Sequence, residues 1–136
     1  MTFFNTKLLD VVRRDTRYTY EAYEFVFQAL EFTHKMLGRE PPDENTDPTE
    51  PRHHVSGPQL LEGIRLFALQ EFGLMARVVF HMWGIRRTDD FGEIVFNLIE
   101  AELMSSTPED RREDFHNLFD LDEALVQGFR IVLEEE

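Results

Sequence analysis

The 136-residue sequence contains no cysteine. Disulfide bonds, thiolate catalysis and cysteine-ligated zinc or iron–sulfur centres are therefore excluded. The fold must be stabilised by burial of apolar side chains, and 42% of the residues are hydrophobic, with thirteen Phe among them. A chain of this length fits one domain that buries roughly two-thirds of its unfolded surface, so we predict a single domain over residues 1–136.

Long apolar runs are absent as well. No stretch of roughly eighteen uncharged apolar residues occurs, which argues against a membrane-spanning helix. The amino end, MTFFNTKLLDVV, does not have the layout of a signal peptide, because its lysine follows the Phe pair and no apolar core precedes a cleavage site. Both absences predict a cytoplasmic protein without a membrane partner.

Basic residues are scarce. The chain has 27 Asp and Glu residues against 14 Lys and Arg residues, which gives a net charge of −13. Residues 105–136 alone hold ten acidic and three basic side chains. Such a surface repels phosphate backbones, so we predict no nucleic-acid partner. The charge favours solubility, with binding to a basic protein surface as the functional alternative.

The segment from Tyr18 to Leu37 is apolar over most of a helical wheel. Only a narrow polar stripe interrupts the apolar surface, which is typical of a helix packed between other elements. Thr19 or Thr16 is expected to cap its amino end, and Gly38 to terminate it. Before it, residues 7–14 form either a short helix or a short strand, because the run is too brief to distinguish the two.

Residues 39–55 contain four of the six prolines among acidic and small polar residues. This composition is too polar to pack and too rich in proline for a helix, so we predict a flexible linker. The chain ends in three glutamates, residues 134–136, where negative charge opposes the helix dipole. We therefore expect these last residues to fray.

The longest continuous apolar periodicity begins at Ser56. Together with Gln59, this serine matches a helix-capping box. Gly73 falls inside the periodic run, where a glycine costs a helix about 1 kcal/mol relative to alanine. We therefore predict two helices, at about 58–71 and 74–83, with one continuous helix as the alternative.

Further helix signals follow along the chain. Gly84 is placed to end the preceding helix, and Thr88 to cap a helix over residues 88–104. A short helix is expected to begin near Thr107, and Asp120 is positioned to start the last one. The whole pattern predicts an all-α fold, a compact bundle of about five to six helices.

Two of these segments are similar to each other. Residues 19–31 align without gaps with residues 88–100, and five of the thirteen positions are identical. Two capped amphipathic helices can share this many residues simply because similar residue types cap a helix and fill its apolar side. The alternative is a duplication, which predicts that helices 19–37 and 88–104 form a pseudo-symmetric pair in the core.

Two Glu-x-x-His motifs have the spacing used in di-iron and di-manganese helical bundles. They are Glu31 with His34 and Glu113 with His116. Glu31 falls on the polar stripe of its helix, and the second motif spans a predicted helix end, so neither motif is expected to point into a core. We therefore predict no metal, no cofactor and no catalytic residue, and these four residues are the candidates if a metal does bind.

Three stretches of the chain carry a resemblance to a known family: VVRRDTRYTYEAYEFVFQALEFT, HVSGPQLLEGIRLFALQEFGLMARVVFHMWGIRRTDDFGEIVFNLIEAELM and REDF. They are similar to the uncharacterised Minf family of small acidic bacterial proteins, and the similarity covers nearly the whole chain outside the linker and tail. The resemblance implies a free-standing protein. It implies no particular function, because the family has no assigned activity, cofactor or catalytic residue.

The sequence offers many aromatic residues but no convergent set of polar residues typical of a catalytic site. We therefore predict a protein-interaction or adaptor module, rather than an enzyme, that binds another protein through an exposed apolar patch. Phe3 and Phe4 at the amino end are candidates for this patch. The other candidates, with two flanking arginines, are Tyr18, Tyr20, Trp83, Ile85, Arg86 and Arg87.

Two alternative functions remain open. A ligand or metal site could be built from His34, His81 and His116 together with nearby carboxylates. The broad apolar surface of residues 18–37 could instead support self-association, which would make the protein structural.

Overall fold

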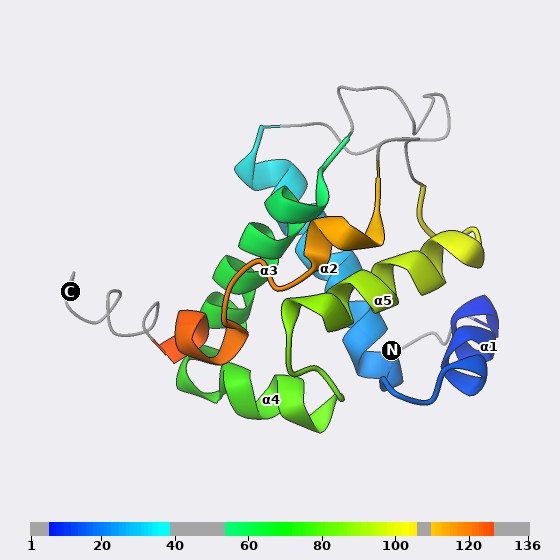
Figure 1. Ribbon diagram of the computed structural model, residues 1–136, viewed down its shortest axis with the longest axis horizontal. Coiled ribbons are helices and arrows are strands. Elements are labelled where there is room, and N and C mark those ends of the chain that lie inside the picture. Colours follow the sequence, from blue (N-terminus) through cyan, green and yellow to red (C-terminus); the bar gives the residue numbers. More distant parts are fainter. Residues whose placement is uncertain (1–5, 39–53, 106–109, 127–136) are drawn as a thin grey trace.

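The computed structural model of the protein describes residues 6–38, 54–105 and 110–126. Over these residues the fold is all-helical, without strands, and the helices pack compactly, which confirms the predicted all-α class (Figure 1). The named helical elements are α1 (Thr6–Arg14), α2 (Tyr20–Met36), α3 (Gly57–Phe72), η2 (Gly73–Met75), α4 (Ala76–Met82), α5 (Thr88–Glu100) and η3 (Arg112–Phe115). Residues 121–126 are also helical.

The helix α2 runs through the centre of the molecule. It packs against α1, α3 and α5, and its fully buried stripe repeats at helical spacing through Ala22, Val26, Ala29 and Thr33 (Figure 1). The prediction that this helix packs between other elements is therefore confirmed. At its start the hydroxyl oxygen of Thr19 accepts a hydrogen bond from the backbone N–H of Ala22, at 3.4 Å, so Thr19 is the cap of the two threonines considered.

The close contact between α2 and α3 depends on one glycine. A Cβ atom at Gly63 would lie only 1.8 Å from the hydroxyl oxygen of Thr33 on α2. That hydroxyl donates a hydrogen bond of 2.6 Å to the backbone oxygen of Ala29, which satisfies it inside the core. Gly63 therefore sets how closely the two helices approach.

The predicted division of residues 58–83 into two helices is confirmed. Ser56 and Gln59 form the expected capping box at the start of α3, with hydrogen bonds of 3.2 and 3.0 Å. The helix ends at Phe72, and the 3₁₀ turn η2 leads into α4. Gly84 then ends α4 with a positive φ of 92°, a conformation that glycine adopts without strain.

The helix α5 differs from the prediction at both ends. Thr88 does not act as its cap, because Arg87 occupies the capping position. The Asp90 carboxylate accepts hydrogen bonds from the backbone N–H groups of Arg86, at 2.8 Å, and Arg87, at 3.0 Å. Thr88 is buried, and its hydroxyl instead donates to the backbone oxygen of Phe115, at 2.7 Å. The sequence pattern did not reveal this contact because the two residues are 27 positions apart.

The predicted extension of this helix to residue 104 is wrong, because α5 ends at Glu100. Glu102 adopts a positive φ of 60°, and the N–H of Leu103 donates to the carbonyl of Leu98, at 2.9 Å. With the bond from the Glu102 N–H to the Ile99 carbonyl, this is the hydrogen-bond pattern of a Schellman helix stop. The stop was not predicted because a glutamate occupies the place where glycine is usual.

After α5 the chain passes through η3, which packs against α3 and α5. The short helix expected near residue 107 is observed as a 3₁₀ turn that begins only at Arg112, and residues 106–109 lie outside the described residues. Asp120 caps the following helical residues as predicted, since its carboxylate accepts from the N–H of Glu123 at 3.0 Å. Of the predicted linker at residues 39–55, only residues 54–55 are among the described residues. The tail at residues 134–136 also lies outside them.

The two similar segments do pack together, because α2 contacts α5. The Asn97 amide on α5 donates to the hydroxyl oxygen of Tyr23 on α2, at 3.0 Å, and to the Asp15 carboxylate, at 2.9 Å. Whether the pair arose by duplication stays a prediction. None of the described helices is both long enough and apolar enough to cross a membrane.

Candidate functional site

Two of the residues expected in an exposed interaction patch are buried. Tyr18 is only 2% exposed, and its hydroxyl donates a 2.7 Å hydrogen bond to the Asp90 carboxylate. Burial, reinforced by this carboxylate, holds the pKa of the Tyr18 hydroxyl far above its usual range. Ile85 is fully buried. These two residues therefore belong to the core, and the prediction that they form an exposed patch is wrong.

Trp83 lies in an aromatic cluster and not on an open surface. Its ring centroid is 5.5 Å from that of Phe25, 5.7 Å from that of Phe72 and 6.1 Å from that of Phe80. Tyr20 is likewise partly buried against the core. Offset and edge contacts of this kind stabilise a core, so Trp83 joins α2, α3 and α4.

Arg86 and Arg87 are exposed, as an interaction surface requires. Neither makes an ion pair with any residue in the described part of the chain. Among the patch candidates that the structure describes, these two arginines remain available to a partner, and Phe3 and Phe4 lie outside the described residues.

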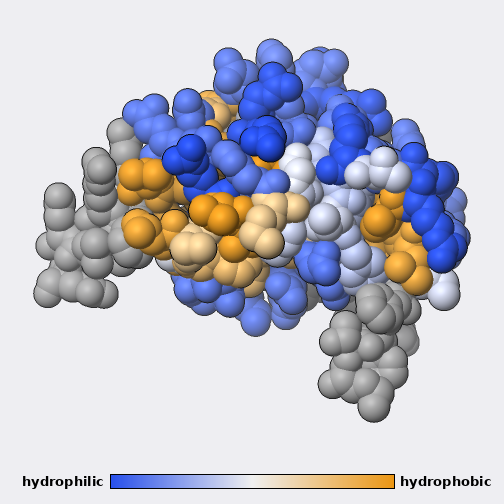
Figure 2. Space-filling model, turned by 90° about the horizontal axis from the view of Figure 1, so that it is seen from below, coloured by the Kyte–Doolittle hydropathy of each residue, from blue (hydrophilic) through white to orange (hydrophobic). Residues whose placement is uncertain are grey.

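The exposed apolar surface lies instead on η2 and α4. The side chains of Leu74, Met75, Val78 and Met82 are 67%, 56%, 47% and 73% exposed, and we call these four the α4 apolar face. Met75, Val78 and Met82 follow one another at steps of three and four residues, which places them on one side of the helix, and Leu74 precedes Met75 directly. Figure 2 views the molecule from the side on which α4 lies in Figure 1, and it shows a hydrophobic area there.

The opposite side of α4 is part of the core. Ala76 and Phe80 are fully buried, and the Phe80 ring meets the Phe91 ring edge to face at a centroid distance of 5.3 Å. Thus α4 is apolar on both sides, and only one side is covered. Sequence reasoning missed the exposed side because, in this segment, it singled out Trp83 and Ile85 as patch candidates and none of the four residues of the α4 apolar face. The available signal was that Arg77 and His81 are the only polar residues in ARVVFHM, which leaves most of the helix circumference apolar.

The α4 apolar face lies in the most basic part of an acidic chain. Residues 72–88 contain three arginines and no acidic residue. At the edge of the helix, Asp122 binds both Arg77, at 3.5 Å, and His81, at 3.0 Å. These contacts hold the carboxyl-terminal helical residues beside α4, without covering the four apolar side chains.

The residues proposed for a metal site are not brought together. Glu31 is exposed and pairs with Lys35, whereas His34 is buried on the same helix. Glu113 is exposed, and the Nδ1 atom of His116 lies 2.6 Å from the Asp89 carboxylate. Within residues 6–38, 54–105 and 110–126, no group of three or more His, Asp or Glu side chains could hold a metal ion.

The histidine cluster suggested for a ligand site is also divided. His81 faces Asp122 beside α4, and His116 faces Asp89 at the start of α5. A backbone hydrogen bond from Asn117, together with His116, holds the pKa of the Asp89 carboxyl below its usual range. Of the three histidines, His34 is the one that lines the pocket described next.

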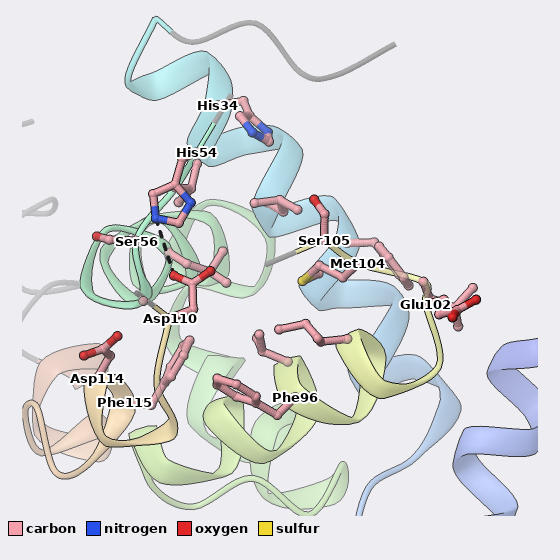
Figure 3. A pocket seen from close by; sticks show the side chains of 18 residues that line it. His34, His54, Ser56, Phe96, Glu102, Met104, Ser105, Asp110, Asp114 and Phe115 are labelled. Atoms are coloured by element: carbon pink, nitrogen blue, oxygen red, sulfur yellow. Dashed lines mark ion pairs between the residues drawn. The ribbon is translucent and has the colours of Figure 1, made fainter. Parts of the chain in front are cut away.

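That pocket has a volume of about 640 Å³ and lies between α2, α5 and the segments at 54–57, 102–105 and 110–115. Figure 3 shows His34, His54, Ser56 and Asp110 gathered toward one end, while Phe96 lies at the other. The Nε2 atom of His54 is 3.4 Å from the Asp110 carboxylate. The four polar side chains His34, His54, Ser56 and Asp110 therefore lie apart from Phe96 along the pocket.

Comparison with known proteins adds no assignment. The chain matches no protein-family model, and neither the curated proteins nor the solved structures contain a significant match. The resemblance to the Minf family stays a prediction.

Proposed function

We propose that the protein is a cytoplasmic protein-interaction module, and that the α4 apolar face binds a partner segment with apolar side chains and acidic flanks. The observation that carries this proposal is the exposure of four large apolar side chains on one side of a helix whose other side is buried. Contiguous apolar surface of this kind is typical of docking sites, whereas single exposed apolar residues are ordinary.

Burial of the α4 apolar face supplies part of the binding free energy. Complete burial of one such side chain is worth about 1.5–3 kcal/mol, so burial of the surface that the four still expose contributes roughly 4–7 kcal/mol. Association itself costs about 4–15 kcal/mol in lost freedom and ordering. The apolar face alone therefore supports weak binding, and polar contacts around it must add affinity and select the partner.

The local charge favours an acidic partner. Arg86 and Arg87 are exposed in a segment without acidic residues, although the whole chain carries a net charge of −13. At physiological salt, charges beyond about 8 Å are largely screened, so the arginines near the face matter more than distant carboxylates. Carboxylates that flank the apolar anchors of a partner would pair with these arginines.

A second copy of the chain fits this face less well. A two-fold contact through α4 would place residues 72–88 of one copy against the same segment of the other, and this segment offers its arginines no acidic partner. Nucleic acid carries the negative charge but lacks the apolar anchors, and the net charge of −13 opposes its approach.

The proposal is tested by selecting binders from a random 16-residue peptide library displayed on phage, with the immobilised full chain as bait. Peptides that also bind the Leu74→Ser/Met82→Ser double variant are removed. We expect the enriched peptides to combine helically spaced apolar residues with Asp and Glu, and to bind with affinities in the micromolar range. Fluorescence anisotropy of the synthetic peptides measures the affinities.

The matched control is Met36→Ser, because Met36 is also an exposed methionine but lies at the far end of α2. Peptide binding should survive this change and weaken when Arg86 and Arg87 are both replaced by Glu. Enrichment of basic peptides, or equal binding to the double variant and the wild type, would refute the proposal. A dimer in sedimentation velocity that Met82→Ser abolishes would assign the face to self-association.

A further inference from the structure

We propose that the pocket between α2 and α5 binds a small amphiphilic molecule with an apolar body and a cationic head, such as an alkyl or aromatic amine. This site is separate from the α4 apolar face, and it does not depend on the proposed protein partner. Its volume of about 640 Å³ falls within the range of roughly 300–1,000 Å³ that is usual for small-molecule sites.

The apolar lining of the pocket comes from three helices. Phe27 and Leu30 come from α2, Leu60 from α3, and Phe96 and Ile99 from α5. Leu60 is buried and the other four are partly buried, so their side chains are already ordered by packing in the core. A cavity whose walls are held in this way binds an apolar group with little further loss of conformational freedom.

The polar end contains a paired carboxylate. The Nε2 atom of His54 lies 3.4 Å from the Oδ1 atom of Asp110, and the two side chains are 27% and 20% exposed. Figure 3 shows this pair at the same end of the pocket as Ser56 and His34. The arrangement orients an elongated ligand, with its polar head toward Asp110 and its apolar body toward Phe96.

The charges around the pocket select the head group. Glu102, Asp110 and Asp114 line it, and no Lys or Arg is among its described lining residues. A carboxylate or phosphate head would meet like charge there. An ammonium head would instead donate charge-assisted hydrogen bonds to a carboxylate, and these are stronger than bonds between neutral groups.

The same residues do not form a hydrolytic triad. Ser56 and Ser105 both line the pocket, but neither donates a hydrogen bond to His54 in the part of the chain that the structure describes. The hydroxyl oxygen of Ser56 caps α3 by accepting from the N–H of Gln59, at 3.2 Å. A catalytic serine requires a hydrogen bond to its histidine, so the geometry supports ligand binding and not acyl transfer.

The test is isothermal titration of the full chain at pH 7 with octylamine, octanol and octanoate, which share one chain length and differ in charge. We expect octylamine to bind at one site about tenfold more tightly than octanol, because its head forms a charged hydrogen bond, and octanoate to bind most weakly. Asp110→Asn should reduce octylamine affinity to that of octanol and leave octanol binding unchanged.

Ile99→Trp and Met104→Trp fill the pocket, and either variant should abolish binding of both ligands while thermal unfolding shows that the chain remains folded. Met82→Ser is the control, because Met82 belongs to the α4 apolar face. The proposal is overturned if no ligand binds, if octanoate binds as tightly as octylamine, or if both tryptophan variants retain binding. Loss of binding in Met82→Ser would place the ligand on α4 and likewise overturn it.

Discussion

The helices α2 and α4 are both apolar around most of their circumference, yet they are covered to different degrees. α2 has seventeen residues and packs against α1, α3 and α5. α4 has seven residues and is covered on the side of Ala76 and Phe80 only. A helix that is apolar all round is expected to lie inside a protein. In our proposal, a partner segment covers the exposed side of α4.

The contacts that hold the two helices also differ in kind. α2 is fixed by close packing, since Gly63 of α3 lies directly against Thr33. At the edge of α4, the side chains of Arg77 and His81 contact Asp122. Substitutions on the covered sides should therefore change stability, whereas substitutions on the outer side of α4 should change binding.

The largest expected effect is on the covered side of α4. Phe80→Ala removes a fully buried ring that contacts the rings of Phe25 and Phe91, so it should lower the free energy of unfolding by about 3–5 kcal/mol. Urea unfolding followed by circular dichroism measures the change. Val78→Ala on the outer side of the same helix is the control, with an expected change within about 0.5 kcal/mol. Equal effects of the two substitutions would contradict the assignment of the two sides.

The next effect concerns the contact between α2 and α3. Gly63→Ala places a Cβ atom against the Thr33 hydroxyl, and we expect a loss of about 1–3 kcal/mol from overpacking. A double-mutant cycle with Thr33→Ala tests the cause. Thr33→Ala removes the nearest atom, so the double variant should be more stable than the sum of the single changes implies. Strict additivity would mean that the destabilisation arises elsewhere.

A smaller effect is expected in the loop between α1 and α2. Arg17 binds the Asp15 carboxylate at 2.7 Å and the Glu93 carboxylate at 3.2 Å. The Arg17 hydrogen bond holds the pKa of Asp15 well below its usual range, although partial burial opposes the shift. Because the folded pKa is lower than the unfolded one, the stabilisation is present above about pH 4 and is lost as the pH falls further.

Asp15→Asn should therefore reduce stability by about 1 kcal/mol at pH 7, since Arg17 is more than half exposed and solvent screens the pair. Urea unfolding at pH 7 and pH 3 measures the difference from the wild type, which should shrink at the lower pH. Asp10→Asn, at an exposed pair with Arg13, is the control and should show no such dependence. A difference that grows toward pH 3 would contradict this account.

The smallest effect on stability is expected at the α4 apolar face. Met82→Ser should change the free energy of unfolding by no more than about 0.5 kcal/mol, because Met82 is 73% exposed. The same substitution should abolish binding of the selected acidic peptides, which anisotropy measures. A strong loss of stability would show that Met82 contributes to the fold and that the face is not free for a partner.

Much of the local structure was predictable because its signals lie close together in the sequence. The capping box of Ser56 and Gln59, the cap at Thr19 and the helix stop at Gly84 all involve residues within five positions of each other. The helix stop after α5 escaped prediction because Glu102 takes the left-handed conformation that glycine usually provides. Local signals therefore predict element boundaries well where the residue types are the usual ones.

The candidate binding sites were much less predictable. Tyr18 and Ile85 were expected on the surface and are buried, while the exposed Leu74 and Met82 were not among the expected patch residues. The pocket brings His34 of α2 together with His54 and Asp110 from distant segments. No spacing in the sequence indicates such a meeting, because it depends on how α2, α3 and α5 cross.

The sequence by itself determined the helical class, the acidic character and the position of most helix ends. These follow from composition and from periodicity over a few residues, which act within one element. Only the tertiary structure decided which apolar side of each helix is covered, because that depends on the neighbours that pack against it. α2 has neighbours on several sides, whereas η2 and α4 leave Leu74, Val78 and Met82 exposed to solvent.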